Sequence, residues 1–282
     1  MFQWPGKKDG EQTERPVYRD PNDLKGQVAV ISGSTSGIGL ALARAVASRG
    51  GDVVLNGLGD PSEIERTRAE LEASCGVRVR YHAANMLKGD EVADMVAFGR
   101  HQLGRVDILV NNAGVQHVEA VEKFPSDKWE QIIAINLSSA FYATRAAIPI
   151  MKAQGRGRIV NIASAHGLVA SPFKSAYVAA KHGVLGFTKT VALEVARDNI
   201  TCNAICPGYV ETPLVQSQIA DQAKARGISK EKVITDVILE AQPTKQFVTT
   251  DQLAGLFLYL ISDLGASANG AAFSIDGGWT AQ

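Results

Sequence analysis

The chain has little of what marks several classes of protein. Its 282 residues include only three cysteines, Cys75, Cys202 and Cys206, an odd and low count that argues against a disulfide-built secreted fold. We interpret all three as buried thiols. Twenty-nine basic residues balance 29 acidic ones, and the missing basic excess argues against a nucleic-acid partner. No apolar run reaches the ~18 residues of a membrane span, so we expect no membrane association.

Residues 1–23 are polar and mixed in charge, and Pro5, Pro16 and Pro21 break any helix. The stretch lacks the apolar core of a secretory signal, and its acidic residues are untypical of a transit peptide. We therefore expect an N-terminal arm over 1–23 and a cytoplasmic protein.

From Leu24 onward, short β-branched runs alternate with longer amphipathic segments, a pattern typical of a parallel sheet with helices on both faces. We predict one α/β domain over 24–282, with about seven strands and a small helical insert over 209–240. The predicted strands are Gln27–Ser32, Asp52–Asn56, Val77–His82, Asp107–Asn111, Arg158–Ala163, Ile200–Ile205 and Ala272–Ile275. The predicted helices are Ile38–Arg49, Pro61–Ser74, Asp90–Leu103, Ser175–Arg197, Thr250–Ser262 and one or two within Asp127–Gln154.

A glycine-rich turn, Gly33-Ser34-Thr35-Ser36-Gly37-Ile38-Gly39, joins the first strand to the first helix. Such a turn brings backbone N–H groups and the positive end of a helix dipole close to a pyrophosphate. The alternative is a tight turn without a ligand. The position of this turn favours a Rossmann-type doubly wound sheet that binds a dinucleotide.

Further motifs follow in order along the chain: Asn111-Asn112-Ala113-Gly114, Asn136, Ser164, Tyr177 with Lys181, and Pro207-Gly208 with Thr212. Together with the spacing of the glycines, this series resembles the short-chain dehydrogenase/reductase superfamily over essentially all of Leu24–Gln282. The resemblance implies a set of cofactor-binding residues: Gly33, Thr35, Ser36, Gly37, Ile38, Gly39, Leu58, Asn85, Met86, Asn112, Ala113, Gly114, Tyr177, Lys181, Pro207, Gly208, Val210 and Thr212.

The choice between NAD and NADP depends on charge beside the ribose, because a 2′-phosphate needs a nearby Arg or Lys. Neither Ser34–Ser36 nor Asn56–Asp60 contains a cation, which favours NAD. The chain departs from the superfamily pattern at two places. Asn56-Gly57 replaces the usual acid at the end of the second strand, and Asn85 replaces an Asp whose role toward the adenine amine an amide oxygen can still perform.

Tyr177 and Lys181 are four residues apart on a predicted helix and share a face. Alone they would be read as a surface pair. A free tyrosine has a pKa of ~10, and a nearby ammonium together with a cationic nicotinamide would lower it. The resemblance implies that Tyr177 is the base, Ser164 binds the substrate oxygen, Lys181 holds the nicotinamide ribose, and Asn136 holds a water linked to Lys181.

Longer strings such as NNAGVQH and NIASAHGLVASPFKSAYVAAKHG resemble the bacterial 3-hydroxybutyrate dehydrogenase branch of the superfamily. That resemblance implies reversible NAD-dependent oxidation of (R)-3-hydroxybutyrate to acetoacetate. It places Ser164 and Tyr177 at the reacting oxygen, Trp279 as a cover of the pocket, and the substrate carboxylate on Gln116, His166, Lys174 and Gln218. Tyr209 and Glu211 depart from the residues usual in that branch, which are Trp and Arg.

Several alternatives stay open. His166 would otherwise cap a loop, Lys174 would be an exposed residue at a helix start, and His117 competes for substrate contact. Another short-chain reductase, such as a 3-oxoacyl carrier-protein reductase using NADPH, or a dehydrogenase of a different small 3-hydroxy acid, would share the catalytic residues. A scaffold without catalysis would have lost them. The resemblance also implies a homotetramer built on Asn136–Gln154 and Ser175–Arg197, and no metal-ligand spacing is present.

Overall fold

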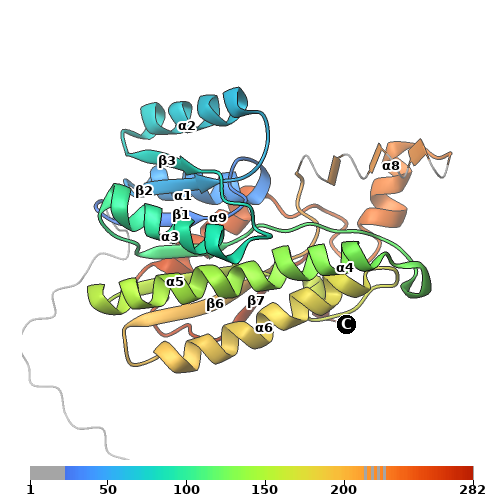
Figure 1. The fold of residues 1–282 in the computed structure, drawn as a ribbon. Coiled ribbons are helices and arrows are strands. Elements are labelled where there is room, and N and C mark those ends of the chain that lie inside the picture. Colours follow the sequence, from blue (N-terminus) through green and yellow to red (C-terminus); the bar gives the residue numbers. More distant parts are fainter. Residues whose placement is uncertain (1–22, 213–214, 217–218, 221–222, 225–226, 282) are drawn as a thin grey trace, which may run out of the picture.

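The structure, a computed structural model, describes residues 23–281 except 213–214, 217–218, 221–222 and 225–226. The predicted arm therefore lies outside the described residues apart from Asp23. The described chain forms a seven-stranded sheet in the order β3-β2-β1-β4-β5-β6-β7, with every pair parallel (Figure 1). The strands are β1 Val28–Ile31, β2 Asp52–Asn56, β3 Val79–His82, β4 Ile108–Asn111, β5 Gly157–Ile162, β6 Ile200–Pro207 and β7 Ala272–Ile275.

Helices cover both faces of the sheet (Figure 1). One face packs against α1 and α9, and the other against α3, α5 and α6. The α-helices are α1 Gly37–Ala47, α2 Pro61–Cys75, α3 Gly89–Leu103, α4 Ser126–Ile133, α5 Ser139–Gln154, α6 Ser175–Val195, α8 Lys230–Val233 and α9 Thr250–Ile261. The predicted doubly wound α/β fold is confirmed.

Strand β1 shows why the central strands read as unbroken apolar runs. Ala29 and Ile31 point into the core on the α1 side, whereas Val28 and Val30 point into the core on the α3 side. All four are at most 1 % exposed. Successive side chains of a strand alternate between faces, so a strand covered on both faces is apolar at every position.

Local signals fix the helix ends. The Asp60 carboxylate accepts hydrogen bonds from the backbone N–H groups of Ser62 and Glu63 at the start of α2, and the helix ends at Gly76 in the left-handed conformation.

The interpretation of all three cysteines as buried thiols is wrong for one of them. Cys75, in the last turn of α2, is partly exposed, whereas Cys202 and Cys206 are buried.

The predicted helical stretch Asp127–Gln154 is two helices, α4 and α5, joined by a π-helical segment at Ala134–Ser138. A π turn inserts one extra residue and is frequent at functional sites. Here it carries the buried Asn136.

The strand order reverses between β1 and β4, since β2 and β3 extend the sheet one way from β1 and β4 to β7 the other. In open α/β sheets, ligands bind at the carboxyl ends of the strands at such a reversal. Outside the sheet, the described part of residues 209–240 includes α8 and packs Val233, Ile238 and Leu239 with Val215 and Ile219 into a small separate core. Within the described residues, no helix has the length and apolar content to cross a membrane.

Candidate active site

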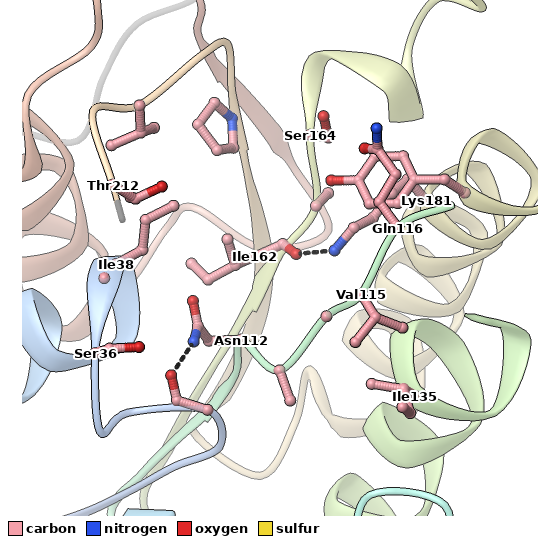
Figure 2. Close-up of a pocket in the computed structure, with 18 of the residues that line it drawn as sticks. Ser36, Ile38, Asn112, Val115, Gln116, Ile135, Ile162, Ser164, Lys181 and Thr212 are labelled. Atoms are coloured by element: carbon pink, nitrogen blue, oxygen red, sulfur yellow. Dashed lines mark hydrogen bonds between the residues drawn. The ribbon is translucent and has the colours of Figure 1, made fainter. Parts of the chain in front are cut away.

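A cavity of about 500 Å³ opens where the strand order reverses. Figure 2 shows residues of the glycine turn at one end and Gln116, Ser164 and Lys181 at the other. The structure brings most of the predicted site residues together around it: Gly33, Thr35, Ser36, Gly37, Ile38, Leu58, Asn85, Met86, Asn112, Ala113, Gly114, Gln116, Ser164, His166, Lys174, Tyr177, Lys181, Pro207, Gly208, Val210, Thr212 and Trp279. Gly39 and Asn136 lie behind this lining, and Gln218 lies outside the described residues.

Two glycines of the glycine turn, Gly33 and Gly39, have no room for a side chain. A Cβ on Gly33 would lie 2.9 Å from the Cα of Ala113, and Gly33 has a φ of 60°. A Cβ on Gly39 would collide with the Gly33 carbonyl and lie 2.5 Å from Asn112 Nδ2. The N-cap residue Ser36 makes no side-chain capping bond, and the first turn of α1 has no acidic residue. The turn therefore presents backbone N–H groups that suit a pyrophosphate.

Asn56 is a site residue that the sequence analysis noted only as a missing acid. Its Oδ1 accepts a hydrogen bond from Gly33 N at 3.1 Å, and its Nδ2 donates to the carbonyls of His82 and Ala84, both at 3.0 Å. The side chain thus joins the turn after β1 to the segment after β3. No local pattern could indicate this, because the partners lie 23 to 28 residues away in the chain.

The next residue, Gly57, lies very close to Thr35 of the glycine turn. A Cβ at position 57 would overlap the Thr35 side chain, with Thr35 Cγ2 2.8 Å away. Leu58 follows and is 71 % exposed. At this end of the cavity, Asn85 already uses one lone pair of Oδ1 for the backbone N–H of Leu87, at 3.0 Å. Among the described lining residues, the lysines are Lys174 and Lys181, both at the opposite end, and arginine does not occur.

Tyr177 and Lys181 project from α6 toward the end of β5. The Lys181 ammonium donates to the carbonyl of Ile162 at 2.7 Å (Figure 2) and lies 5.6 Å from the centre of the Tyr177 ring. Burial lowers the pKa of Lys181 to about 8. Burial also raises the pKa of Tyr177, against the opposing effect of a hydrogen bond with Ser164. The expected lowering of the Tyr177 pKa is therefore not found in the protein alone, because desolvation outweighs the hydrogen bond with Ser164.

The side-chain amide of Asn136 makes two hydrogen bonds with the backbone of Val115. Its Oδ1 accepts from Val115 N and its Nδ2 donates to Val115 O, both at 2.9 Å. The side-chain amide therefore fixes the segment between β4 and α4 that carries Gln116. The predicted water on Asn136 stays a prediction.

The opposite end of the cavity is aromatic and cationic. Lys174 donates to the Tyr209 hydroxyl at 3.2 Å. Tyr209 stacks on Trp279 with ring centres 5.6 Å apart and planes 9° apart. The completely buried Gln242 positions Tyr209, because its Oε1 accepts from Tyr209 N at 2.5 Å. The sequence analysis missed Gln242, which stands in a segment without a recognisable motif.

His166 is engaged at both ring nitrogens. Nδ1 lies 3.4 Å from Ser164 Oγ, and Nε2 lies 2.9 Å from the Oγ of Ser171, another residue that the sequence analysis missed. The backbone N–H of His166 also donates to Ser164 Oγ at 3.2 Å. Burial, followed by the charge of Lys174, lowers the pKa of His166 to about 3, so the ring is neutral near pH 7. No group of three or more His, Cys, Asp or Glu side chains in the described chain could hold a metal ion.

The comparisons with known proteins agree with this geometry. The family model described as short chain dehydrogenase matches residues 27–223, and the chain belongs to that family. It is therefore an oxidoreductase with a fold that binds a nicotinamide cofactor.

Particular relatives are more similar. The chain is 59 % identical over 256 residues to the D-beta-hydroxybutyrate dehydrogenase of Rhizobium meliloti, covering 91 % of this chain and 99 % of the relative. It is 52 % identical over 260 residues to that of Cupriavidus necator, covering 92 % and 100 %. Among solved structures, L-sorbose reductase from Gluconobacter frateurii, complexed with NADPH and L-sorbose, matches with a TM-score of 0.88 and 32 % identity, covering 93 % of this chain and 100 % of that one.

Proposed function

We propose that this protein catalyses the reversible, NAD-dependent oxidation of (R)-3-hydroxybutyrate to acetoacetate. The observation that carries the proposal is the Lys174 ammonium in the same cavity as Ser164, Tyr177 and Lys181. A short hydroxy acid needs a cation within a few ångström of its reacting carbon, whereas a sterol or a long acyl chain would need a mainly apolar pocket. The likeness to two D-beta-hydroxybutyrate dehydrogenases over nearly their whole lengths supports the same substrate.

NAD is the proposed cofactor. The residues present fit a dinucleotide, because the glycine turn leaves room for backbone contact with phosphates at the start of α1. Thr35, Gly57 and Leu58 offer no positive charge at the ribose end, where a 2′-phosphate would need one. When bound, the nicotinamide supplies a two-electron acceptor for the hydride of the carbinol carbon.

The chain's own residues handle the proton and the oxygen. Tyr177, as phenolate, removes the proton of the substrate hydroxyl, and Ser164 donates a hydrogen bond to the same oxygen. Lys181 lies beside the Tyr177 ring, so its ammonium favours the phenolate. In the reverse direction, Tyr177 returns the proton to the oxygen of acetoacetate.

We assign the carboxylate of the substrate to Lys174, Gln116 and His166, which line the same cavity. Lys174 supplies the positive charge, Gln116 an amide donor, and Trp279 an apolar wall behind Tyr209. The predicted contact of Gln218 with the carboxylate stays a prediction. The predicted closing of residues 209–240 over the substrate also stays a prediction. So does the homotetramer, which is supported by the exposed apolar side chains of Phe141 on α5 and Leu193 on α6.

The test is the formation of NADH with (R)-3-hydroxybutyrate, beside the (S) enantiomer, the methyl ester of the substrate, and NADP in place of NAD. Turnover confined to the (R) acid and NAD would support the substrate, the cofactor and the Lys174 site together. Turnover of uncharged alcohols alone would retain Tyr177 and Lys181 and reject the anion site. Equal use of NADP would reject the proposed nucleotide preference.

A further inference from the structure

We propose that the hydroxyl group of Tyr209 is a further ligand of the substrate carboxylate, in addition to the three side chains assigned to it above. The inference deepens the proposed function and rests on it for the presence of a carboxylate. In the sequence, Tyr209 stands out only as a departure from the tryptophan usual in the resembled branch. In the structure, its hydroxyl meets Lys174 at the substrate end of the cavity.

The chemistry of lysine fixes the direction of the hydrogen bond between Lys174 and Tyr209. An ammonium group has three N–H donors and no acceptor, so Lys174 Nζ donates and the phenolic oxygen accepts, over 3.2 Å. The O–H proton of Tyr209 therefore points away from Lys174. Within the described part of the chain, the Tyr209 hydroxyl has no other hydrogen-bond partner. Its proton is available to an acceptor that enters the cavity.

The backbone and the ring of Tyr209 are both held in place. Gln242 Oε1 accepts from the backbone N–H of Tyr209, and the backbone N–H of Val248 donates to the Tyr209 carbonyl at 2.9 Å. The ring is stacked on Trp279 with the two planes 9° apart. A tyrosine side chain has only two χ angles to restrict. Binding a ligand through this hydroxyl therefore costs little further ordering of the side chain.

Lys174 and Tyr209 together present one charged and one neutral donor on neighbouring atoms. After its bond to Tyr209, Lys174 Nζ keeps two N–H groups, and the hydroxyl of Tyr209 keeps its proton. An ionised carboxylate has two oxygens and only accepts, so one carboxylate can bind both donors. An apolar chain end at the same place would leave both donors without partners, which costs binding free energy. The pair therefore favours a short acid over an alcohol with an apolar end.

This assignment is separable from an alternative in which Tyr209 is only an apolar wall. A Tyr209→Phe substitution keeps the ring that stacks on Trp279, so it leaves a wall unchanged. A donor to the carboxylate binds the substrate and the transition state alike, because the charge of the carboxylate does not change in the reaction. Loss of such a donor raises KM and leaves kcat nearly unchanged.

The first experiment measures kcat and KM of Tyr209→Phe with (R)-3-hydroxybutyrate. Tyr259→Phe is the matched control, because Tyr259 on α9 is exposed and lies outside the cavity. We expect KM to rise about tenfold in Tyr209→Phe, the size of one lost hydrogen bond to a charged group. The kcat and the Kd for NAD should stay within about twofold. An unchanged KM would overturn the proposal, and so would a loss expressed in kcat instead of KM.

The same substitution in a Lys174→Ala background separates donation by Tyr209 from mere support of Lys174. If the hydroxyl only held the ammonium in place, its removal would change nothing once the ammonium is gone. We expect Tyr209→Phe to raise KM by a further factor of about three or more in this background. No further rise would show that Tyr209 acts only through Lys174 and would overturn the proposal.

A binding measurement with butyrate separates this proposal from the proposed function, because butyrate has the carboxylate but no hydroxyl to oxidise. Calorimetric titration in the presence of NAD gives the Kd of butyrate for the wild type and for Tyr209→Phe. We expect about tenfold weaker binding by the variant. Equal affinity, or no binding by the wild type, would overturn this proposal even if 3-hydroxybutyrate is a substrate. A tenfold difference without turnover of 3-hydroxybutyrate would reject the proposed function and support Tyr209 as a carboxylate ligand.

Discussion

The two ends of the cavity are built in different ways. At the nucleotide end, the side-chain amides of Asn56 and Asn112 hydrogen-bond to the backbone of the glycine turn. The glycines pack so closely that a single added methyl group at Gly39 has no room. At the substrate end, Lys174 and Tyr209 meet through side chains. The first arrangement fixes the path of the chain, so it accepts little change. The second fixes the ends of side chains, and these can be exchanged on an unchanged backbone. Specificity for the alcohol can therefore change without loss of the nucleotide site.

The largest expected effect separates chemistry from both kinds of binding. Tyr177→Phe removes the proton acceptor and should lower kcat about a thousandfold, within the range for general acid–base residues. The nucleotide affinity should stay within about twofold, because the ring remains. Steady-state rates and calorimetric titration with NAD measure the two quantities, with Tyr259→Phe on α9 as control. Substantial turnover by Tyr177→Phe would refute the mechanism.

The Gly39→Ala substitution tests the packing at the nucleotide end of the cavity. The added Cβ must displace both the Gly33 carbonyl and the Asn112 amide, and overpacking of this kind costs about 1–3 kcal/mol. We expect the Kd for NAD to rise up to about a hundredfold, measured by titration calorimetry. Gly255→Ala on α9 is the matched control, because a Cβ there meets nothing within 4 Å. Equal NAD affinity in the two variants would contradict the close packing described for the turn.

The Lys174→Ala substitution tests carboxylate binding at the substrate end of the cavity. Loss of a charge-assisted bond to the carboxylate should raise KM for 3-hydroxybutyrate about thirtyfold, with kcat and NAD affinity changed little. The exposed Lys189 on α6 gives the control variant Lys189→Ala. A loss of the same size with the uncharged methyl ester would show that Lys174 does not act on the carboxylate.

The smallest effect is on stability in acid. His166 has a pKa of about 3 in the folded chain against an ordinary value of 6.5. Between these values the unfolded chain binds a proton that the folded chain does not, so stability falls as the pH drops from 6.5 toward 3. At about pH 5 the cost is about 2 kcal/mol. Urea unfolding of wild type and His166→Gln over this range should show a shallower pH dependence in the variant. Parallel curves would mean that His166 titrates normally.

At both ends of the cavity, the sequence predicted residues that line the cavity better than the residues that support them. The glycine turn and the strand before it are consecutive residues, and the central β-branched strands are distinctive because both of their faces are buried. Gln242 could not be found in this way, because its partner Tyr209 lies 33 residues away in the chain. Ser171 lies near its partner His166 in the chain but stands in a loop, where no regular period indicates which side chains meet. The π-helical segment at Ala134–Ser138 was missed because one inserted residue hardly disturbs the period of a long helical stretch.

The close approach of Gly57 to Thr35 has a consequence for how such a protein can diverge. A mutation that places any side chain at position 57 meets the Thr35 side chain first. Its effect therefore depends on which residue stands at position 35, and a smaller residue there has to arise before or together with the change. Position 58 has no such constraint, since Leu58 is largely exposed. Evolutionary shifts in nucleotide preference should thus begin at position 58 and reach position 57 only in lineages that have already altered position 35.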